Sequence, residues 1–151
     1  MSELNPIRIF ITHAFQEHEF YTRVFEYLES RDNFYYLNCS NLAAPAAGSG
    51  QEALHEAIRS QMRDAEAVLF PVEIHAQNPR LIDFELTVAQ AFKKPIIAIK
   101  AHGGTQLIPR DALAAAVEIV DWNDRLITEA LRRHGRGENV PKWDVIDFDP
   151  D

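Results

Sequence analysis

Glu85 combines a chemically active side chain with an unexpected position in the sequence. The stretch around it predicts a helix, because Asn78 can cap its start, Pro79 suits its first turn and Pro95 stops it. At about 100° per residue, Glu85 falls in the middle of the apolar arc of this helix. An ionised carboxylate in a packed interior costs free energy unless it is paired or hydrogen-bonded. Glu85 is therefore the first candidate for chemistry.

Two interpretations of Glu85 remain open on the sequence alone. In the first, Glu85 lies at a rim or forms a buried ion pair with an arginine such as Arg8, Arg59 or Arg63. In the second, its carboxylate faces a cleft and meets a ligand. The second interpretation makes Glu85 a functional residue.

The rest of the chain alternates between short apolar runs and segments with helical periodicity. The predicted strands are residues 7–12, 34–37, 67–72, 95–99 and 118–122. The predicted helices are residues 17–30, 51–63, 79–94, 110–115 and 123–133. This alternation predicts an α/β fold, a single-domain, flavodoxin-like, doubly wound sheet of five parallel strands. We expect residues 1–133 to form the domain and residues 134–151 to form an acidic C-terminal tail.

Ligands of open α/β sheets bind beyond the carboxyl ends of the strands, where the strand order reverses. In a flavodoxin-like order, this crevice lies between the first and third strands, and we expect Glu85 to overhang it. The side chains expected to reach the crevice are Thr12, His13, Ala14 and Phe15 after the first strand, residues 38–41 with Ser40 after the second, and residues 73–75 after the third. Ser40 belongs to the longest loop of the chain. His13 is either a loop-capping residue or a hydrogen-bond partner of the ligand.

Composition and charge exclude several classes of protein. With 151 residues, of which 46% are hydrophobic, the chain is long enough for one well-packed domain. Its net charge of −8 argues against binding to nucleic acid, whose phosphates require Lys and Arg contacts. The sequence contains neither an apolar run long enough to span a membrane nor a signal peptide. We therefore expect a cytoplasmic protein that binds no membrane.

The sequence lacks the common motifs of metal and nucleotide sites. Cys39 is the only cysteine, which excludes an intrachain disulfide and a thiolate metal cage. The His-Glu pairs that begin at His18 and His55 do not extend to HExxH, so no metal site is predicted. Gly48, Ser49 and Gly50 open a helix but lack the Lys that follows in a phosphate-binding P-loop.

Three segments of the chain resemble TIR and TIR-like domains. IRIFITHAFQEHEFYTRVFEYL is similar to the opening strand and first helix of these domains, and EAIRSQMRDAEAVLFPVEI to their second helix and third strand. LIDFELTVAQAFKKPIIAI resembles their motif of a Glu within an amphipathic helix, followed by a Lys-Pro-Ile-Ile strand. The resemblance covers about residues 7–133. It is strongest to compact bacterial TIR-like proteins, including the sensor proteins of Thoeris-type anti-phage defence.

This resemblance implies an activity, a substrate and a site. TIR-like enzymes use NAD as a substrate, not as a cofactor: they break the bond between nicotinamide and ribose. Many of them join the ADP-ribose into a cyclic or conjugated signal for a partner effector protein, and they often need self-association. Their catalytic glutamate corresponds to Glu85, which we expect to contact the nicotinamide ribose. The expected substrate-binding residues around it are Thr12, His13, Ala14, Phe15 and Ser40.

Two other functions remain open. The chain has Leu81 where many TIR domains have a Trp four residues before the catalytic Glu. A nucleoside deoxyribosyltransferase-like enzyme has the same predicted fold and uses a glutamate as its nucleophile. A non-catalytic TIR interaction module is the other alternative, and it would bind a partner without turning over NAD.

Overall fold

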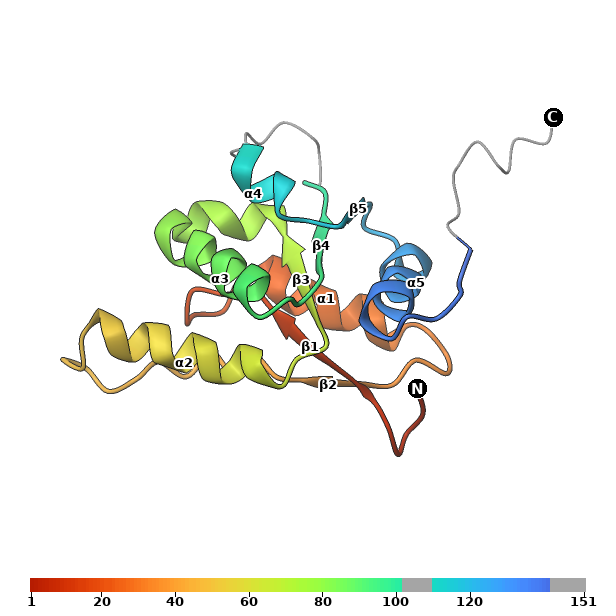
Figure 1. Ribbon diagram of the computed structural model, residues 1–151, viewed down its shortest axis with the longest axis horizontal. Helices are drawn as coiled ribbons and strands as arrows, with labels where there is room; N and C mark the ends of the chain where they lie inside the picture. Colours follow the sequence, from red (N-terminus) through yellow and green to blue (C-terminus); the bar gives the residue numbers. More distant parts are fainter. Residues whose placement is uncertain (102–109, 142–151) are drawn as a thin grey trace.

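The computed structural model describes residues 1–101 and 110–141, and in these ranges five parallel strands form one sheet. The strands are β1 (Ile7–Ile11), β2 (Tyr36–Asn38), β3 (Ala67–Pro71), β4 (Ile96–Ile99) and β5 (Glu118–Val120). Their order is β2-β1-β3-β4-β5, and each neighbouring pair runs parallel (Figure 1). The order reverses between β1 and β3, as in flavodoxin-like sheets. The predicted fold class is confirmed.

Helices cover both faces of the sheet. α1 (Glu19–Glu29) and α5 (Asp124–Gly135) contact each other on one face, and α2 (Gln51–Arg63) and α3 (Pro79–Ala91) contact each other on the opposite face (Figure 1). The short helix α4 (Arg110–Ala114) precedes β5. No helix among the described residues is long and apolar enough to cross a membrane.

The ends of two strands differ from the sequence prediction. β2 begins at Tyr36, which pairs with Ile7, whereas Phe34 packs into the core ahead of the strand. After β3 the chain forms a 3-10 helix, η1 (Val72–Gln77), which the hydrophobic pattern did not predict. Pro71 ends β3 because it has no N–H to donate to a sheet ladder, and η1 follows directly.

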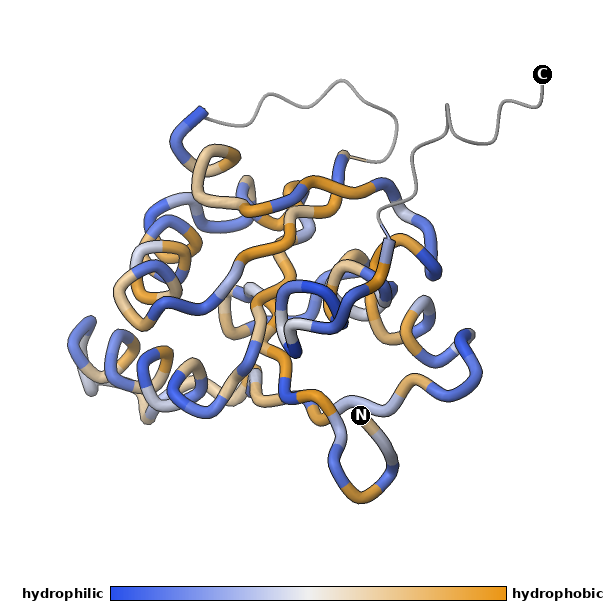
Figure 2. Tube along the Cα trace, turned by 45° about the vertical axis from the view of Figure 1, so that its right-hand side comes forward, coloured by the Kyte–Doolittle hydropathy of each residue, from blue (hydrophilic) through white to orange (hydrophobic). Residues whose placement is uncertain are grey.

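Polar residues in the interior are concentrated at one end of the sheet. The central strands β1, β3 and β4 are almost wholly buried, which explains their apolar β-branched sequences. Figure 2 shows them as the hydrophobic centre of the molecule. Among the described residues, the buried polar or charged side chains are Thr12, His13, Ser40, Glu73, His75, Glu85 and Thr128. All of these except Thr128 follow the carboxyl ends of β1, β2 and β3 or lie on α3, where the sequence predicts the crevice.

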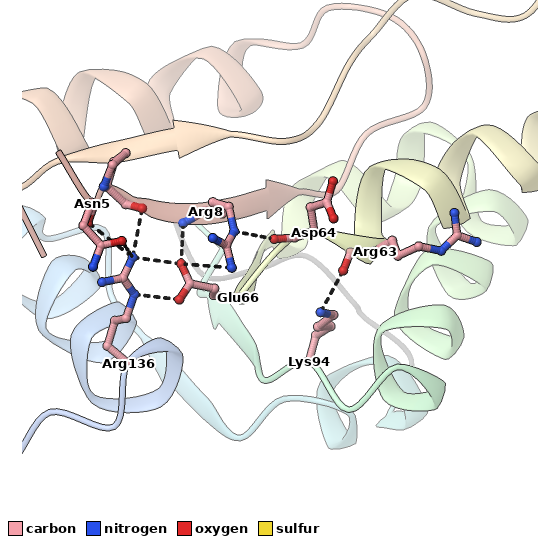
Figure 3. A network of polar contacts seen from close by, with 8 residues as sticks. Asn5, Arg8, Arg63, Asp64, Glu66, Lys94 and Arg136 are labelled. Carbon is pink, nitrogen blue, oxygen red and sulfur yellow. Dashed lines mark hydrogen bonds and ion pairs between the residues drawn. The ribbon is translucent and has the colours of Figure 1, made fainter. Parts of the chain in front are cut away.

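An ion-pair network around Glu66 holds the opposite, amino-terminal end of the sheet (Figure 3). The guanidinium of Arg136 donates to the two carboxylate oxygens of Glu66 at 2.6 and 3.0 Å, and to the carbonyl oxygen of Pro6 at 2.9 Å. The backbone N–H of Arg8 donates to the same carboxylate at 2.9 Å. These contacts join β1, the start of β3 and the end of α5.

α5 continues past the boundary that we predicted between the domain and its tail. The helix ends at Gly135, two residues beyond the expected end at about Arg133, and Arg136 forms the ion pair described above. Glu138 pairs with the N-terminal amine of Met1 at 3.7 Å. The first part of the predicted tail therefore packs on the domain. Residues 142–151 of that tail lie outside the described residues.

Gly135 lies too close to β1 and β3 for a side chain. A Cβ at this position would come within 2.8 Å of Ile7 Cδ1 and 3.3 Å of Ala67 Cβ. We expect Gly135→Ala to lower the free energy of unfolding by about 1–3 kcal/mol, because the core must shift to admit the methyl group. Urea unfolding measures this change. The cost should be smaller in an Ile7→Val background, which removes Cδ1, and an equal cost in both backgrounds would contradict the contact.

Candidate active site

Helix α3 places Glu85 on its buried face. The helix begins where predicted, since the Asn78 side chain accepts a hydrogen bond from the Leu81 N–H at 3.2 Å and Pro79 occupies the first turn. The buried side chains of this helix are Leu81, Ile82, Glu85, Leu86, Val88 and Ala89, and the exposed ones include Asp83, Thr87 and Gln90. The predicted apolar arc is confirmed. Glu85 lies within it and is 0% exposed.

The carboxyl group of Glu85 receives one hydrogen bond. Its Oε1 atom accepts from the backbone N–H of His13 at 3.0 Å, and its Oε2 atom has no partner among the described residues. The arginines that the sequence offered as ion-pair partners bind elsewhere: Arg8 contacts Glu66, whereas Arg59 and Arg63 contact Glu56. Within residues 1–101 and 110–141 Glu85 forms no ion pair, which contradicts the ion-pair interpretation.

Burial raises the pKa of Glu85 well above its ordinary value, and the hydrogen bond from the His13 N–H opposes this rise only in part. The closed site therefore favours a neutral carboxylic acid. A cation that approaches the group would favour its ionised form, because opposite charges stabilise each other strongly where water is excluded. This arrangement suits a group that must meet developing positive charge.

Both ring nitrogens of His13 are hydrogen-bonded inside the protein. Nδ1 accepts from the Phe15 N–H at 3.1 Å, and Nε2 lies 2.9 Å from Oε1 of Gln61. Because a backbone N–H can only donate, Nδ1 is the acceptor and Nε2–H is the donor to Gln61. Burial lowers the pKa of His13, although the Gln61 contact opposes this, and the result agrees with a neutral ring. In this structure His13 caps its loop, and its backbone reaches Glu85.

The loop after β1 carries a strained residue next to the candidate catalytic group. Phe15 has a φ of 59°, a left-handed conformation that costs a non-glycine residue about 1–3 kcal/mol. Its ring meets the His13 ring edge-on, with the centroids 4.8 Å apart. Ala14 is half-buried, and Thr12 is buried with its Oγ1 atom lacking a partner among the described residues. His13 and Glu85 are in direct contact, and Thr12, Ala14 and Phe15 adjoin them along the loop.

Ser40 belongs to a neighbouring polar network. Its hydroxyl lies 2.8 Å from the hydroxyl of Tyr21, and both its hydroxyl and its N–H donate to the side-chain oxygen of Asn38. The Asn38 amide donates in turn to the Tyr21 hydroxyl at 3.2 Å. The hydrogen bonds of Ser40 therefore join it to Tyr21 and Asn38, whereas the hydrogen bond of Glu85 joins it to His13.

Two further predicted crevice residues lie on η1. Glu73 and His75 are buried there, and His75 Nε2 lies 2.8 Å from a carboxylate oxygen of Asp83 on α3. Within the described ranges, no three His, Cys, Asp or Glu side chains gather as metal ligands would.

Sequence reasoning missed Gln61, which connects two loops of the site. Its Oε1 atom accepts from the His13 ring and from the Asn41 N–H at 3.0 Å, and its Nε2 donates to the Asn41 carbonyl oxygen at 3.1 Å. A signal existed, because Gln61 follows Leu54 by seven residues and Ile58 by three, on the apolar face of its helix. It is the same conflict between residue type and position that identified Glu85.

We expect Gln61→Leu to lower the free energy of unfolding by about 1–3 kcal/mol, because the His13 ring and the Asn41 backbone lose their partners. Hydrogen exchange of the Asn41 amide should accelerate more than that of the Leu28 amide in α1. Gln51→Leu on the exposed start of the same helix is the control, and it should leave both measurements near wild type. An unchanged Asn41 exchange rate would contradict the bridge.

A family model described as Thoeris protein ThsB, TIR-like domain, matches residues 10–106 of the chain. The match covers more than half of the 151 residues and includes both His13 and Glu85. No curated protein matches the chain. The resemblance to TIR-like domains is thus confirmed. The chain belongs to the family of Thoeris ThsB TIR-like domains, and it is a TIR-type defence protein.

Proposed function

We propose that this protein cleaves the bond between nicotinamide and ribose in NAD, with Glu85 as the catalytic carboxylate. The observation that carries the proposal is the burial of Glu85 without a cationic partner among the described residues, at the end of the sheet where strand order reverses. Such a group weakens the fold at neutral pH, so its presence is better explained by chemistry than by packing. Membership of the TIR-like family supports the same conclusion.

The reaction requires little beyond one well-placed carboxylate. Nicotinamide in NAD is already a cationic leaving group, so the electrons of the C–N bond pass to the ring nitrogen and neutral nicotinamide departs. The ribose carbon then carries oxocarbenium-like positive charge until water or another nucleophile attacks it. As the positively charged nicotinamide ring arrives, Glu85 would release its proton to water and would stabilise the charge on the ribose carbon at short range.

Access to Glu85 requires movement, because the side chain has no exposed surface in this structure. The β1–α1 loop, whose His13 N–H holds the carboxyl, must shift for the ribose to reach it. We propose that association between copies of the chain promotes this opening. We further propose that the ADP-ribose product is released as a cyclic or conjugated signal for an effector protein.

The test is to incubate the purified protein with NAD and to follow nicotinamide and the ADP-ribose products by chromatography. A series of protein concentrations tests the need for self-association, since the rate per molecule should rise with concentration. Parallel reactions contain a 2′-deoxynucleoside. Release of a free base from the nucleoside but not from NAD would favour a deoxyribosyltransferase. Absence of turnover at every concentration would contradict the proposal and favour an interaction module.

A further inference from the structure

A cleft of about 350 Å³ opens between the first turns of α2 and α3. Its lining residues are Gln51, Leu54, His55, Asn78, Arg80 and Leu81. Leu81 lies four residues before Glu85 and is 8% exposed, so it faces the cleft one helical turn away from the carboxyl group. Glu85 itself does not line the cleft and has no exposed surface, so Leu81 is the residue that connects the two.

Arg80 gives the cleft a positive charge that no described acidic side chain neutralises. The residues that the structure describes offer it neither an ion pair nor a side-chain hydrogen bond, although the chain has a net charge of −8. The acidic groups nearest in sequence on both helices are engaged: Glu52 pairs with Arg59 at 3.0 Å, and Asp83 contacts His75 at 2.8 Å. An exposed guanidinium beside occupied carboxylates leaves the cleft suited to an anion.

Besides Arg80, the cleft is lined by two amide side chains and by His55, whose ring stacks on the neighbouring helix. His55 stacks on Phe84 of α3 with ring centroids 3.8 Å apart and planes 14° apart, which joins the two helices at the cleft. The side chains of Gln51 and Asn78 add amide groups to the lining, and none of the lining residues is acidic. This combination favours a polar anion over an apolar or cationic ligand.

We propose that this cleft binds the diphosphate of the dinucleotide, with Arg80 as its cationic contact. This inference rests on the proposed function, because it places the substrate around Glu85. The diphosphate is attached to the 5′ carbon of the same ribose whose C1′ bond would break. Arg80 lies five residues before Glu85 on α3, about 1.4 helical turns along the axis, and it shares the cleft with Leu81, which lies one turn before Glu85. The planar guanidinium can donate two parallel hydrogen bonds to phosphate oxygens, which a lysine cannot reproduce.

Binding of ADP and adenosine to the intact protein, measured by calorimetry, tests the cleft without any turnover. Arg80→Ala should weaken ADP binding by about tenfold, which corresponds to the loss of a charge-assisted contact. Adenosine, which has no phosphate, should not distinguish Arg80→Ala from wild type. Arg31→Ala is the matched control, because it removes the same charge from the end of α1, outside the cleft. Equal ADP affinity in wild type and Arg80→Ala, or no ADP binding to wild type, would overturn the assignment.

Steady-state kinetics separate this assignment from the proposed function. For NAD, Arg80→Ala should raise KM about tenfold and leave kcat near wild type, whereas cleavage of nicotinamide riboside should be unaffected. NAD cleavage with an unchanged KM in Arg80→Ala would refute the diphosphate site and leave the proposed function standing. Arg80-dependent ADP binding without NAD cleavage would support the diphosphate site and contradict the proposed function.

Discussion

Glu85→Gln is expected to release nicotinamide from NAD about 10²- to 10³-fold more slowly than the wild type, the usual cost of losing one electrostatic contact to a transition state. Glutamine has nearly the same shape, and its carbonyl can accept the hydrogen bond that His13 N–H now donates to Glu85. What it lacks is the ability to become negatively charged. The loss should therefore appear mainly in kcat, measured by chromatography of free nicotinamide.

The same substitution should make the protein more stable at neutral pH. Because the folded-state pKa of Glu85 is raised above its ordinary value of 4.5, its stabilising contribution is complete below that pH. It is lost as the pH rises through the folded-state pKa, since ionisation is then disfavoured in the fold. The unfolding free energy of Glu85→Gln minus that of wild type should therefore increase from about pH 4.5 upward.

Asp83→Asn is the control for both measurements. It removes one carboxylate from the exposed side of the same helix, and it should keep the wild-type rate of nicotinamide release. Its stability difference from wild type should not follow the pH dependence expected for Glu85→Gln. Equal turnover by wild type and Glu85→Gln would remove Glu85 from the mechanism.

Arg136→Ala is expected to lower the free energy of unfolding by about 2–4 kcal/mol, because it leaves the partly buried carboxylate of Glu66 without its guanidinium partner. This loss should exceed that of Arg59→Ala. The side chain of Arg136 is 14% exposed and that of Glu66 is 19% exposed, so water compensates little. Burial alone would raise the pKa of Glu66, but the Arg136 and Arg8 contacts outweigh it and lower the pKa. The stabilisation should therefore be present above the ordinary carboxyl pKa and be lost as the pH falls through the folded-state value.

Denaturant unfolding at several pH values measures this prediction. Arg136→Lys should recover only part of the loss, because an ammonium cannot donate in parallel to both carboxylate oxygens. Arg59→Ala is the matched control, since Arg59 pairs with Glu52 and Glu56 at the surface, where water screens the charges, and should contribute little to stability. Similar losses for Arg136→Ala and Arg59→Ala would contradict a special role of the Glu66 network.

The sequence was sufficient for the fold and for the position of Glu85. Alternating apolar strands and one-faced helices specify the layers, because each element must bury its apolar surface. Glu85 could be recognised because its type conflicts with its place on the helix. The direct contact between His13 and Glu85 is consistent with the order of the strands, which brings the end of β1 beside α3.

Other features of the structure depend on contacts between distant segments. Arg136 and Glu66 are 70 residues apart in the chain, and neither is unusual in its own segment. The Tyr21 to Ser40 contact likewise joins a helix to a loop without any local pattern. The 3-10 helix η1 was missed because its short length leaves no clear period. Periodicity describes which side of an element is buried, but it does not identify the partner.

Gln61 makes the two loops over the site energetically dependent on each other. Its single amide group holds the His13 ring on one side and the Asn41 backbone on the other, and His13 in turn holds Glu85. A ligand or neighbouring molecule that displaces the β2–α2 loop therefore also weakens the restraint on the carboxyl group. By thermodynamic linkage the effect is reciprocal. A substrate that draws Glu85 away from His13 therefore favours displacement of the β2–α2 loop by the same factor.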